Sequence, residues 1–325
     1  MKLALLGHSG VGKTTYIATV YGLMQAKKKM GLGLSAENRL DHKALMDAFR
    51  AIRHGHYPPP TAVRSQYHFS LTHAGERILS FLWADYRGGD LRDSTDSPGA
   101  SALRQDLSQC DGIIVFADGS LAARSGERSR ARVQLGRIAQ LMAGGMPRRN
   151  TRRLPIALVL TKADLAENPG EVAVDLFDGL REVIARSDHL IGTIVAASCA
   201  PKTTGRGSVF SWLARLWGRR HETFGVNVEL PLLFLLRFGL DDLIEDLAFQ
   251  QCHQQETAEH YRNQVDRRWF RNWLAEIAFV TSDAMRAQQA QENAENLLLQ
   301  LQPLVPSADA MGGRLKGLPL FGATK

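Results

Sequence analysis

Residues 7–14 read GHSGVGKT and fit the spacing GxxxxGK[ST], which is typical of loops that bind phosphate groups. Glycines there let the backbone curl so that several N–H groups point inward at phosphates, and the N-terminus of a following helix adds a favourable partial charge. Lys13 is expected to reach the β- and γ-phosphates, and the Thr14 hydroxyl is expected to ligate Mg²⁺. The residues expected to form this phosphate loop are Gly7, His8, Ser9, Gly10, Val11, Gly12, Lys13, Thr14 and Thr15.

A second group of residues, Asp85-Tyr86-Arg87-Gly88, ends the apolar run 77–84 and fits the pattern DxxG. Asp85 would hold Mg²⁺ through a water molecule. The N–H of Gly88 would bond the γ-phosphate, at a position where only glycine allows close approach. In the company of the phosphate loop, we interpret this turn as part of the same site rather than as an ordinary end of a strand.

A third group, Thr161-Lys162-Ala163-Asp164, follows the continuous apolar run 156–160. The Asp164 carboxylate can accept two hydrogen bonds from guanine, one from N1–H and one from the 2-amino group, whereas adenine offers no such pair of donors. The stem of Lys162 can cover one face of the base. The pattern therefore favours GTP and GDP as ligands and disfavours the alternative of an ATP-using protein.

Together, these motifs resemble the Ras-like, translation-factor-related class of P-loop GTPases over roughly residues 1–245. The extended turn at residues 85–89 and the helical tail resemble, more narrowly, bacterial GTPases of the double-GTPase group. The resemblance implies that Thr61, in the segment YPPPT, is the Mg²⁺-binding switch threonine. It also implies that Ser198 and Cys199 belong to a base-closing loop whose backbone N–H meets guanine O6, although the lysine of that loop is Ala200 here.

The resemblance implies GTP hydrolysis with Lys13, Thr61 and Gly88 in catalytic positions. Many small GTPases carry a glutamine after DxxG that orients the attacking water, and here that residue is Gly89. We therefore expect slow hydrolysis unless Gln66, Arg87 or a partner protein completes the site. The alternative is a binding module that holds GTP, scarcely hydrolyses it and recruits an effector.

The elements that must position these motifs alternate between strand and helix patterns up to about residue 200. Runs such as 112–117 and 156–160 are continuously apolar, which is typical of strands buried on both faces. We expect a three-layer α/β fold, with a mostly parallel sheet and helices on both faces. Residues 65–84 are expected to form a hairpin that adds one antiparallel edge strand, and residues 31–33 are expected to end the first helix.

We predict a P-loop GTPase domain over residues 1–250, closed by a helix at residues 230–249, and a helical extension over residues 251–325. A basic and aromatic segment at about 201–225 is expected to be an insertion. The tail after Pro303 is expected to fray because it is rich in proline and glycine. The second half of the extension could pack on the GTPase domain or bind a partner.

The composition limits the classes of partner. The 325 residues carry a formal charge of +7, with a pI near 9.5. This charge is typical either of a mildly basic cytosolic surface or of a protein with an acidic partner, such as a nucleotide, nucleic acid or an anionic membrane surface. Nucleic acid is disfavoured because no basic stripe with interleaved aromatic residues is present. The three cysteines have no zinc-binding spacing. We expect a cytoplasmic protein without a transmembrane helix, a buried role rather than a membrane contact for residues 209–220, and an unknown protein effector or activator.

Overall fold

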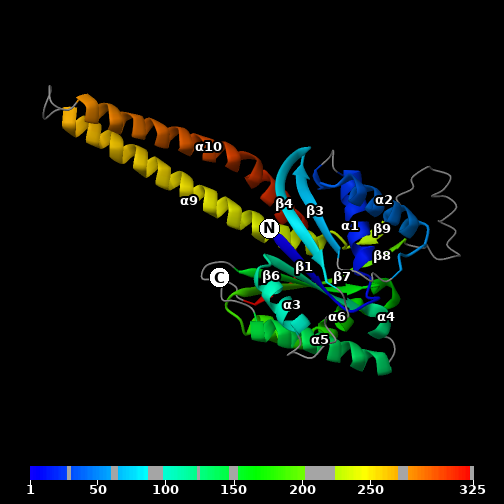
Figure 1. The fold of residues 1–325 in the computed structure, drawn as a ribbon. Coiled ribbons are helices and arrows are strands. Elements are labelled where there is room, and N and C mark those ends of the chain that lie inside the picture. The colour runs from blue at the N-terminus through cyan, green and yellow to red at the C-terminus, as the bar shows by residue number, and fades with distance from the viewer. Residues whose placement is uncertain are drawn as a thin grey trace. The chain divides into compact units, whose positions relative to one another are not determined.

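The computed structural model describes residues 1–27, 31–59, 65–86, 98–122, 125–145, 153–201, 224–269 and 277–322. Strands and helices alternate through most of the described chain (Figure 1). The strands are β1 (Lys2–Leu6), β2 (Leu32–Ala36), β3 (Ser65–His73), β4 (Glu76–Asp85), β5 (Gly112–Asp118), β6 (Leu154–Thr161), β7 (Leu190–Ala196), β8 (Ser198–Pro201), β9 (Phe224–Val226) and β10 (Leu320–Gly322). The helices are α1 (Lys13–Lys27), α2 (Arg39–Arg53), α3 (Pro98–Ser108), α4 (Gly119–Ala122), α5 (Ser125–Gly145), the 3₁₀ helix η1 (Ala163–Leu165), α6 (Pro169–Leu176), α7 (Asp178–Ala185), α9 (Leu230–Trp269) and α10 (Ile277–Leu315).

The main sheet has the strand order β10-β7-β6-β5-β1-β4-β3-β2. Its centre, from β7 to β4, is parallel, and the pairs β3–β4, β2–β3 and β10–β7 are antiparallel. Every residue of β5 and β6 is buried, as their apolar sequences require for strands covered on both faces. The predicted α/β class with a mostly parallel sheet is therefore confirmed.

Helices cover both faces of this sheet. On one face, α3, α5, α6 and α7 contribute apolar side chains to a single core with alternate residues of β1, β5 and β6. On the other face, Tyr16 and Tyr21 of α1 join an aromatic cluster with Phe116 of β5, Trp83 of β4 and Phe69 of β3. Because the core packs on both sides of the central strands, their carboxyl ends are held at one edge, where ligands bind in open α/β sheets.

The structure corrects two sequence expectations at the β2 edge. The hairpin β3–β4 forms as predicted, but β3 is not the edge strand, because β2 pairs with it from Leu32 opposite His73 to Ala36 opposite Phe69. The segment that begins β2 was expected only to end the first helix. Leu32 and Leu34 are buried, but so is Gly33 between them, so burial does not alternate at the start of this strand and the two-residue period of a half-exposed strand is missing.

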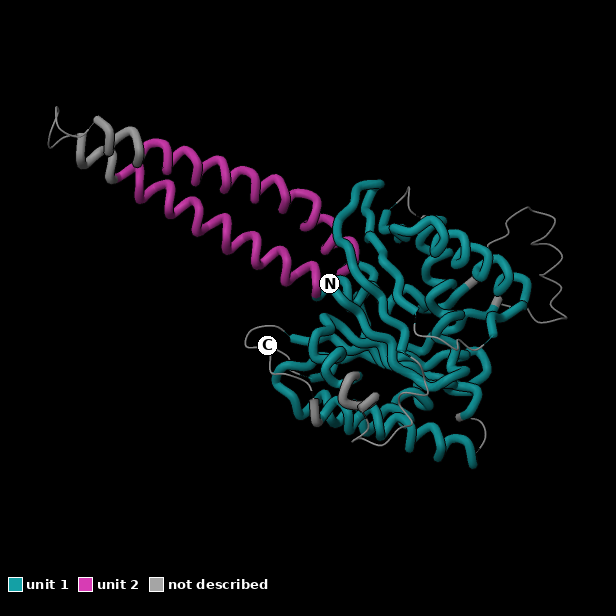
Figure 2. The backbone as a smooth tube through the Cα atoms, viewed as in Figure 1, with its two compact units in different colours: residues 1–238, 313–325 teal, residues 239–312 magenta. Residues whose placement is uncertain are grey.

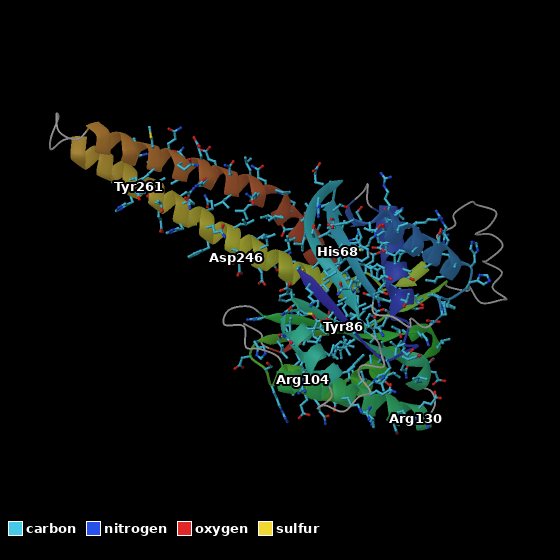
Figure 3. The ribbon with its side chains drawn as sticks, in the orientation of Figure 1. His68, Tyr86, Arg104, Arg130, Asp246 and Tyr261 are labelled. Atoms are coloured by element: carbon cyan, nitrogen blue, oxygen red, sulfur yellow. The ribbon has the colours of Figure 1, made fainter. Side chains whose placement is uncertain are left out.

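The chain divides into two compact units, which are coloured separately in Figure 2. The first consists of Met1–Phe238 and Gly313–Lys325, and the second of Gly239–Gly312. The predicted domain boundary at residue 250 falls inside the long helix α9. In the second unit, α9 and α10 form a helical hairpin. Asp246 and Tyr261, labelled in Figure 3, belong to α9. The buried α10 residues of the hairpin include two groups with coiled-coil spacings of three and four, Ala287, Ala290 and Ala294 and then Leu304, Ala308 and Met311.

The expected fraying after Pro303 is wrong. Helix α10 continues through Pro303 and Pro306 to Leu315, although an interior proline costs about 3 kcal/mol. Buried residues beyond the prolines hold the helix in place, and the Ser307 hydroxyl donates to the Pro303 carbonyl at 2.7 Å. After the helix, β10 pairs with β7, with Phe321 opposite Gly192.

None of the helices in the described part of the chain is long and apolar enough to cross a bilayer.

Candidate functional site

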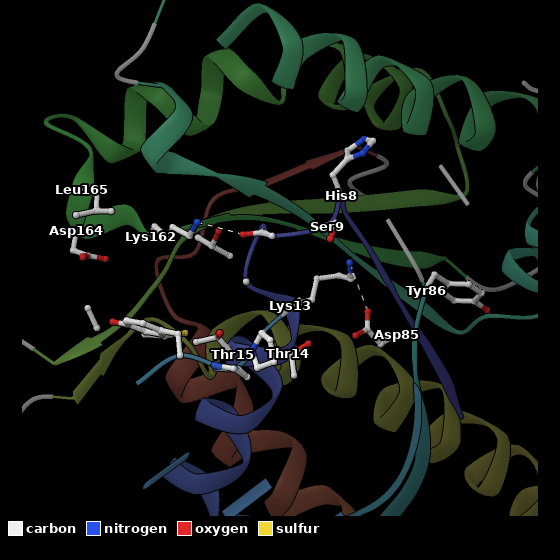
Figure 4. A pocket seen from close by; sticks show the side chains of 18 residues that line it. His8, Ser9, Lys13, Thr14, Thr15, Asp85, Tyr86, Lys162, Asp164 and Leu165 are labelled. Atoms are coloured by element: carbon white, nitrogen blue, oxygen red, sulfur yellow. Dashed lines mark hydrogen bonds and ion pairs between the residues drawn. The ribbon is translucent and has the colours of Figure 1, made fainter. Parts of the chain in front are cut away.

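A cavity of about 550 Å³ opens at the carboxyl ends of the central strands (Figure 4). It is bounded by the loop after β1, the end of β4, the loop after β6, the segment around β8 and the residues after α2. Its lining residues are His8, Ser9, Gly10, Gly12, Lys13, Thr14, Thr15, Tyr57, Pro58, Pro59, Asp85, Tyr86, Thr161, Lys162, Asp164, Leu165, Cys199 and Ala200. The motifs that the sequence analysis singled out therefore meet at one cavity.

At two positions in the loop after β1, the backbone has a conformation that only glycine adopts freely. Gly10 has φ +84° and Gly12 has φ +93°, so an L side chain at either would be strained. Helix α1 begins directly afterwards at Lys13, with the N–H of Tyr16 donating to the Gly12 carbonyl at 2.8 Å. The curled loop thus ends at a helix N-terminus, where unpaired backbone N–H groups attract anions.

Lys13 and Asp85 form the charged end of the cavity, and Figure 4 draws the contact between them. The Nζ of Lys13 donates a 2.7 Å hydrogen bond to the Gly7 carbonyl and lies 3.8 Å from Asp85 Oδ1, too far for a hydrogen bond. Burial lowers the pKa of Lys13, and the Asp85 charge opposes this effect. Burial raises the pKa of Asp85 to about 6, against the opposing effect of Lys13. The Lys13 ammonium and the Asp85 carboxylate are both buried, yet they make only this long contact with each other. This arrangement indicates a site that accommodates a further charged group.

At the opposite end, Asp164 is held by Ser198, the first residue of β8. The Ser198 hydroxyl donates a 2.5 Å hydrogen bond to Asp164 Oδ1 and also lies 3.2 Å from the backbone N–H of Ala200. Cys199, next in the chain, lines the cavity, and burial raises the pKa of its thiol to about 12. This end therefore offers one oriented carboxylate that can accept hydrogen bonds from a base.

Thr161 and Lys162 tie the two ends together. The Thr161 hydroxyl lies 2.6 Å from the carbonyl of Val11, in the phosphate loop, and 3.0 Å from that of Ala117. The Lys162 ammonium donates to the Gly10 carbonyl at 3.3 Å and to Asp118 Oδ2 at 2.5 Å. These bonds fix the spacing between the loop after β1 and the loop after β6.

Not every predicted site residue lines the cavity. Gly7, Val11 and Ser198 lie behind the lining and hold it through the bonds described above. Gln66 is an exposed residue of β3, opposite Ala84, and is not part of the lining. Thr61, Gly88, Arg87 and Gly89 lie outside the described residues.

Sequence reasoning missed several residues of the cavity. Tyr57, Pro58 and Pro59 line it. Burial raises the pKa of Tyr57, and the negative charge of Asp164 raises it further. Tyr86, labelled in Figure 3, also lines it, and its hydroxyl donates a 2.8 Å hydrogen bond to Asp106. The sequence analysis singled out the segment YPPPT for Thr61 and gave no role to Tyr57, Pro58 or Pro59, because their side chains carry no motif chemistry.

Comparison with known proteins identifies one family. The family model described as Double-GTPase 2 matches residues 2–217. No protein with a curated function matches the sequence.

Two solved structures are similar to parts of the chain. The Arl6 BBS3 small GTPase from Trypanosoma brucei, with a bound nucleotide analogue, is 19% identical over 68% of this chain and 98% of its own, with a TM-score of 0.34. The signal recognition particle receptor SRb-GTP/SRX complex from Chaetomium thermophilum is 13% identical over 66% of this chain and 97% of the matched chain, with a TM-score of 0.37.

Proposed function

Because the chain belongs to the Double-GTPase 2 family, and so is a P-loop GTPase of the double-GTPase group, we propose that it is a switch that binds Mg²⁺-GTP and hydrolyses it slowly. A protein partner would then complete the site and accelerate hydrolysis. Guanine-nucleotide binding is the property that the family implies. The Mg²⁺ ion, the slow rate of hydrolysis and the partner protein go beyond what the family implies.

The observation that carries the proposal is the chemical polarity of the cavity. One end presents the Lys13 ammonium and the N-terminus of α1, which attract phosphate oxygens. The other end presents the Asp164 carboxylate, oriented by Ser198, which accepts hydrogen bonds from a base. A nucleoside triphosphate is a ligand with an anionic end and a hydrogen-bond-donating end, and guanine supplies the donors that Asp164 needs.

The residues present fit a magnesium ion. The Thr14 hydroxyl and the Asp85 carboxylate both line the phosphate end, and hard oxygen ligands are those that Mg²⁺ prefers. Asp85 is buried, and its Oδ1 accepts no hydrogen bond from the part of the chain that the structure describes. We propose that Thr14 holds the ion directly and that Asp85 holds it through water, with Thr61 as a further ligand. A bound Mg²⁺ supplies charge that offsets the negative phosphates.

Hydrolysis should be slow in the isolated chain. Phosphoryl transfer depends on positioning and charge stabilisation, and Lys13, the α1 N-terminus and Gly88 address the charge. Nothing among the described lining residues is a glutamine, and Gln66 lies outside the lining. We expect a single-turnover rate of about one per hour, which corresponds to a barrier of about 22 kcal/mol.

The test begins with purified protein freed of nucleotide and titrated with fluorescent GDP, GTP and ATP, with and without Mg²⁺. GTP and GDP should bind tightly and ATP weakly. Asp164→Asn should reverse the base preference toward xanthosine triphosphate, because Asn donates to the oxygen that replaces the 2-amino group. Equal affinity of the unmutated protein for ATP and GTP would contradict the proposal.

The second candidate function is a GTP-bound module with negligible hydrolysis, which Gly89 at the usual glutamine position favours. Single-turnover hydrolysis separates the two functions. A rate of about one per hour, raised about 10³–10⁵-fold by a partner, supports the switch. GTP that stays intact over days, with or without a partner, supports the module.

A further inference from the structure

Asp118 is a buried carboxylate that belongs to none of the nucleotide motifs. It ends β5, and its side chain is 6% exposed. Its Oδ1 accepts hydrogen bonds from the backbone N–H of Ser120 at 2.9 Å and from the Ser120 hydroxyl at 2.6 Å. Its Oδ2 accepts the 2.5 Å hydrogen bond from the Lys162 ammonium. Both carboxylate oxygens of Asp118 are therefore bonded and shielded from water, while the Lys162 side chain is 39% exposed.

The position of Asp118 is set by a close approach of two strand ends. In the parallel pairing of β5 and β6, Asp118 lies opposite Thr161. The next residue, Gly119, has no Cβ, and a Cβ there would lie 2.7 Å from the Thr161 carbonyl oxygen. Any larger residue at position 119 would push the end of β5 away from the loop that carries Lys162. The close packing therefore brings the carboxylate within reach of the ammonium.

Lys162 in turn spans the site. Its backbone is left-handed, with φ +50°, a conformation that residues other than glycine adopt at some cost. From there its ammonium also reaches the Gly10 carbonyl in the phosphate loop, and Figure 4 shows the side chain extending toward that loop. The side chain that should cover one face of the base thus bridges two parts of the cavity.

We infer that Asp118 is a positioning residue for the nucleotide: by holding the Lys162 ammonium, it keeps the phosphate loop and the base-reading loop at the spacing of a bound guanine nucleotide and so slows its release. The inference rests on the proposed function, because it concerns the same cavity. A flexible lysine has many rotamers, and confining it before binding removes that entropic cost from the complex.

The experiment measures GDP dissociation from the purified full chain by chasing fluorescent GDP with excess unlabelled GDP. Asp118→Asn keeps an oxygen for the Ser120 donors but removes the charge that holds Lys162. It should raise the dissociation rate about tenfold or more, which corresponds to at least about 1.4 kcal/mol. The preference for guanine over xanthine should not change, because Asp164 is untouched.

A double-mutant cycle tests whether Asp118 acts through Lys162. Lys162→Gln should raise the dissociation rate by a similar factor, and the double variant should release GDP no faster than the faster single variant. Additive effects would mean that Asp118 acts elsewhere and would overturn the inference. Ser120→Ala removes one donor to Asp118 and should raise the rate by a few fold, so it decides the question if Asp118→Asn does not fold.

Asp175→Asn is the matched control. Asp175 pairs with Arg128 and Arg132 in the same unit but away from the cavity, so its loss should lower the melting temperature without changing GDP release. A folded Asp118→Asn protein with the dissociation rate of the parent would overturn the inference and leave the proposed function intact. A parent protein that binds neither GDP nor GTP would instead overturn the proposed function.

Discussion

Replacing Asp85 by asparagine should stabilise the nucleotide-free protein at neutral pH while removing its Mg²⁺-dependent affinity for GTP. The carboxylate is 5% exposed, and its only ion pair is the loose contact with Lys13 among the described residues. Burial raises its pKa from 3.8 to about 6, so the folded protein disfavours the ionised form. Asparagine has nearly the shape of the protonated acid and carries no charge to bury.

The magnitude follows from proton linkage. A shift of about two pKa units corresponds to about 3 kcal/mol, at about 1.4 kcal/mol per unit. Between pH 3.8 and about 6, the folded protein binds more protons at this site than the unfolded chain. The stabilising contribution of Asp85 is therefore complete below pH 3.8 and is lost as the pH rises through 6. Asp85→Asn should match the parent near pH 4 and exceed its free energy of unfolding by about 1–3 kcal/mol at pH 7.5.

The assay is urea denaturation of both nucleotide-free proteins from pH 4 to pH 8, followed by GTP titration with and without Mg²⁺ at pH 7.5. Taking the difference between the two proteins cancels the titration of the other carboxylates. Asp178→Asn serves as the control, since its side chain is 80% exposed and its charge should contribute little at any pH. An Asp85→Asn protein less stable than the parent at pH 7.5 would refute the reasoning, as would unchanged Mg²⁺-dependent affinity.

Three further predictions concern other parts of the cavity. Lys13→Ala should weaken Mg²⁺-GTP binding by about 10²-fold or more in a protein that still folds, because charge-assisted hydrogen bonds contribute about 1.5–3 kcal/mol each; isothermal titration calorimetry measures this. Ser198→Ala should weaken GTP about 5- to 10-fold relative to ATP, because the hydroxyl that orients Asp164 is lost, and unchanged discrimination in competition titrations would contradict this. Near pH 8, a thiol reagent should modify the exposed Cys252 quickly and leave Cys199, whose pKa burial raises to about 12, unmodified, as peptide mass mapping would show.

The sequence alone determined the parts of the site whose chemistry is local. The phosphate loop needs glycines, a lysine and a threonine within eight consecutive residues, so spacing predicts it without knowledge of the fold. The buried strands β5 and β6 are equally plain, because a continuous apolar run reports burial directly. For the same reason, Asp85 could be placed at the end of one strand and Asp164 in the loop after another.

Tertiary structure alone decided which distant groups meet. Asp118 and Lys162 are 44 residues apart, and Ser198 and Asp164 are 34 apart, so each pairing depends on the register of neighbouring strands. The same holds for β2 and β10, which are short and form strands by pairing with β3 and β7. Periodicity along the chain reports which faces are buried, whereas the free energy of a hydrogen bond depends on a partner that only the folded sheet brings within 3 Å.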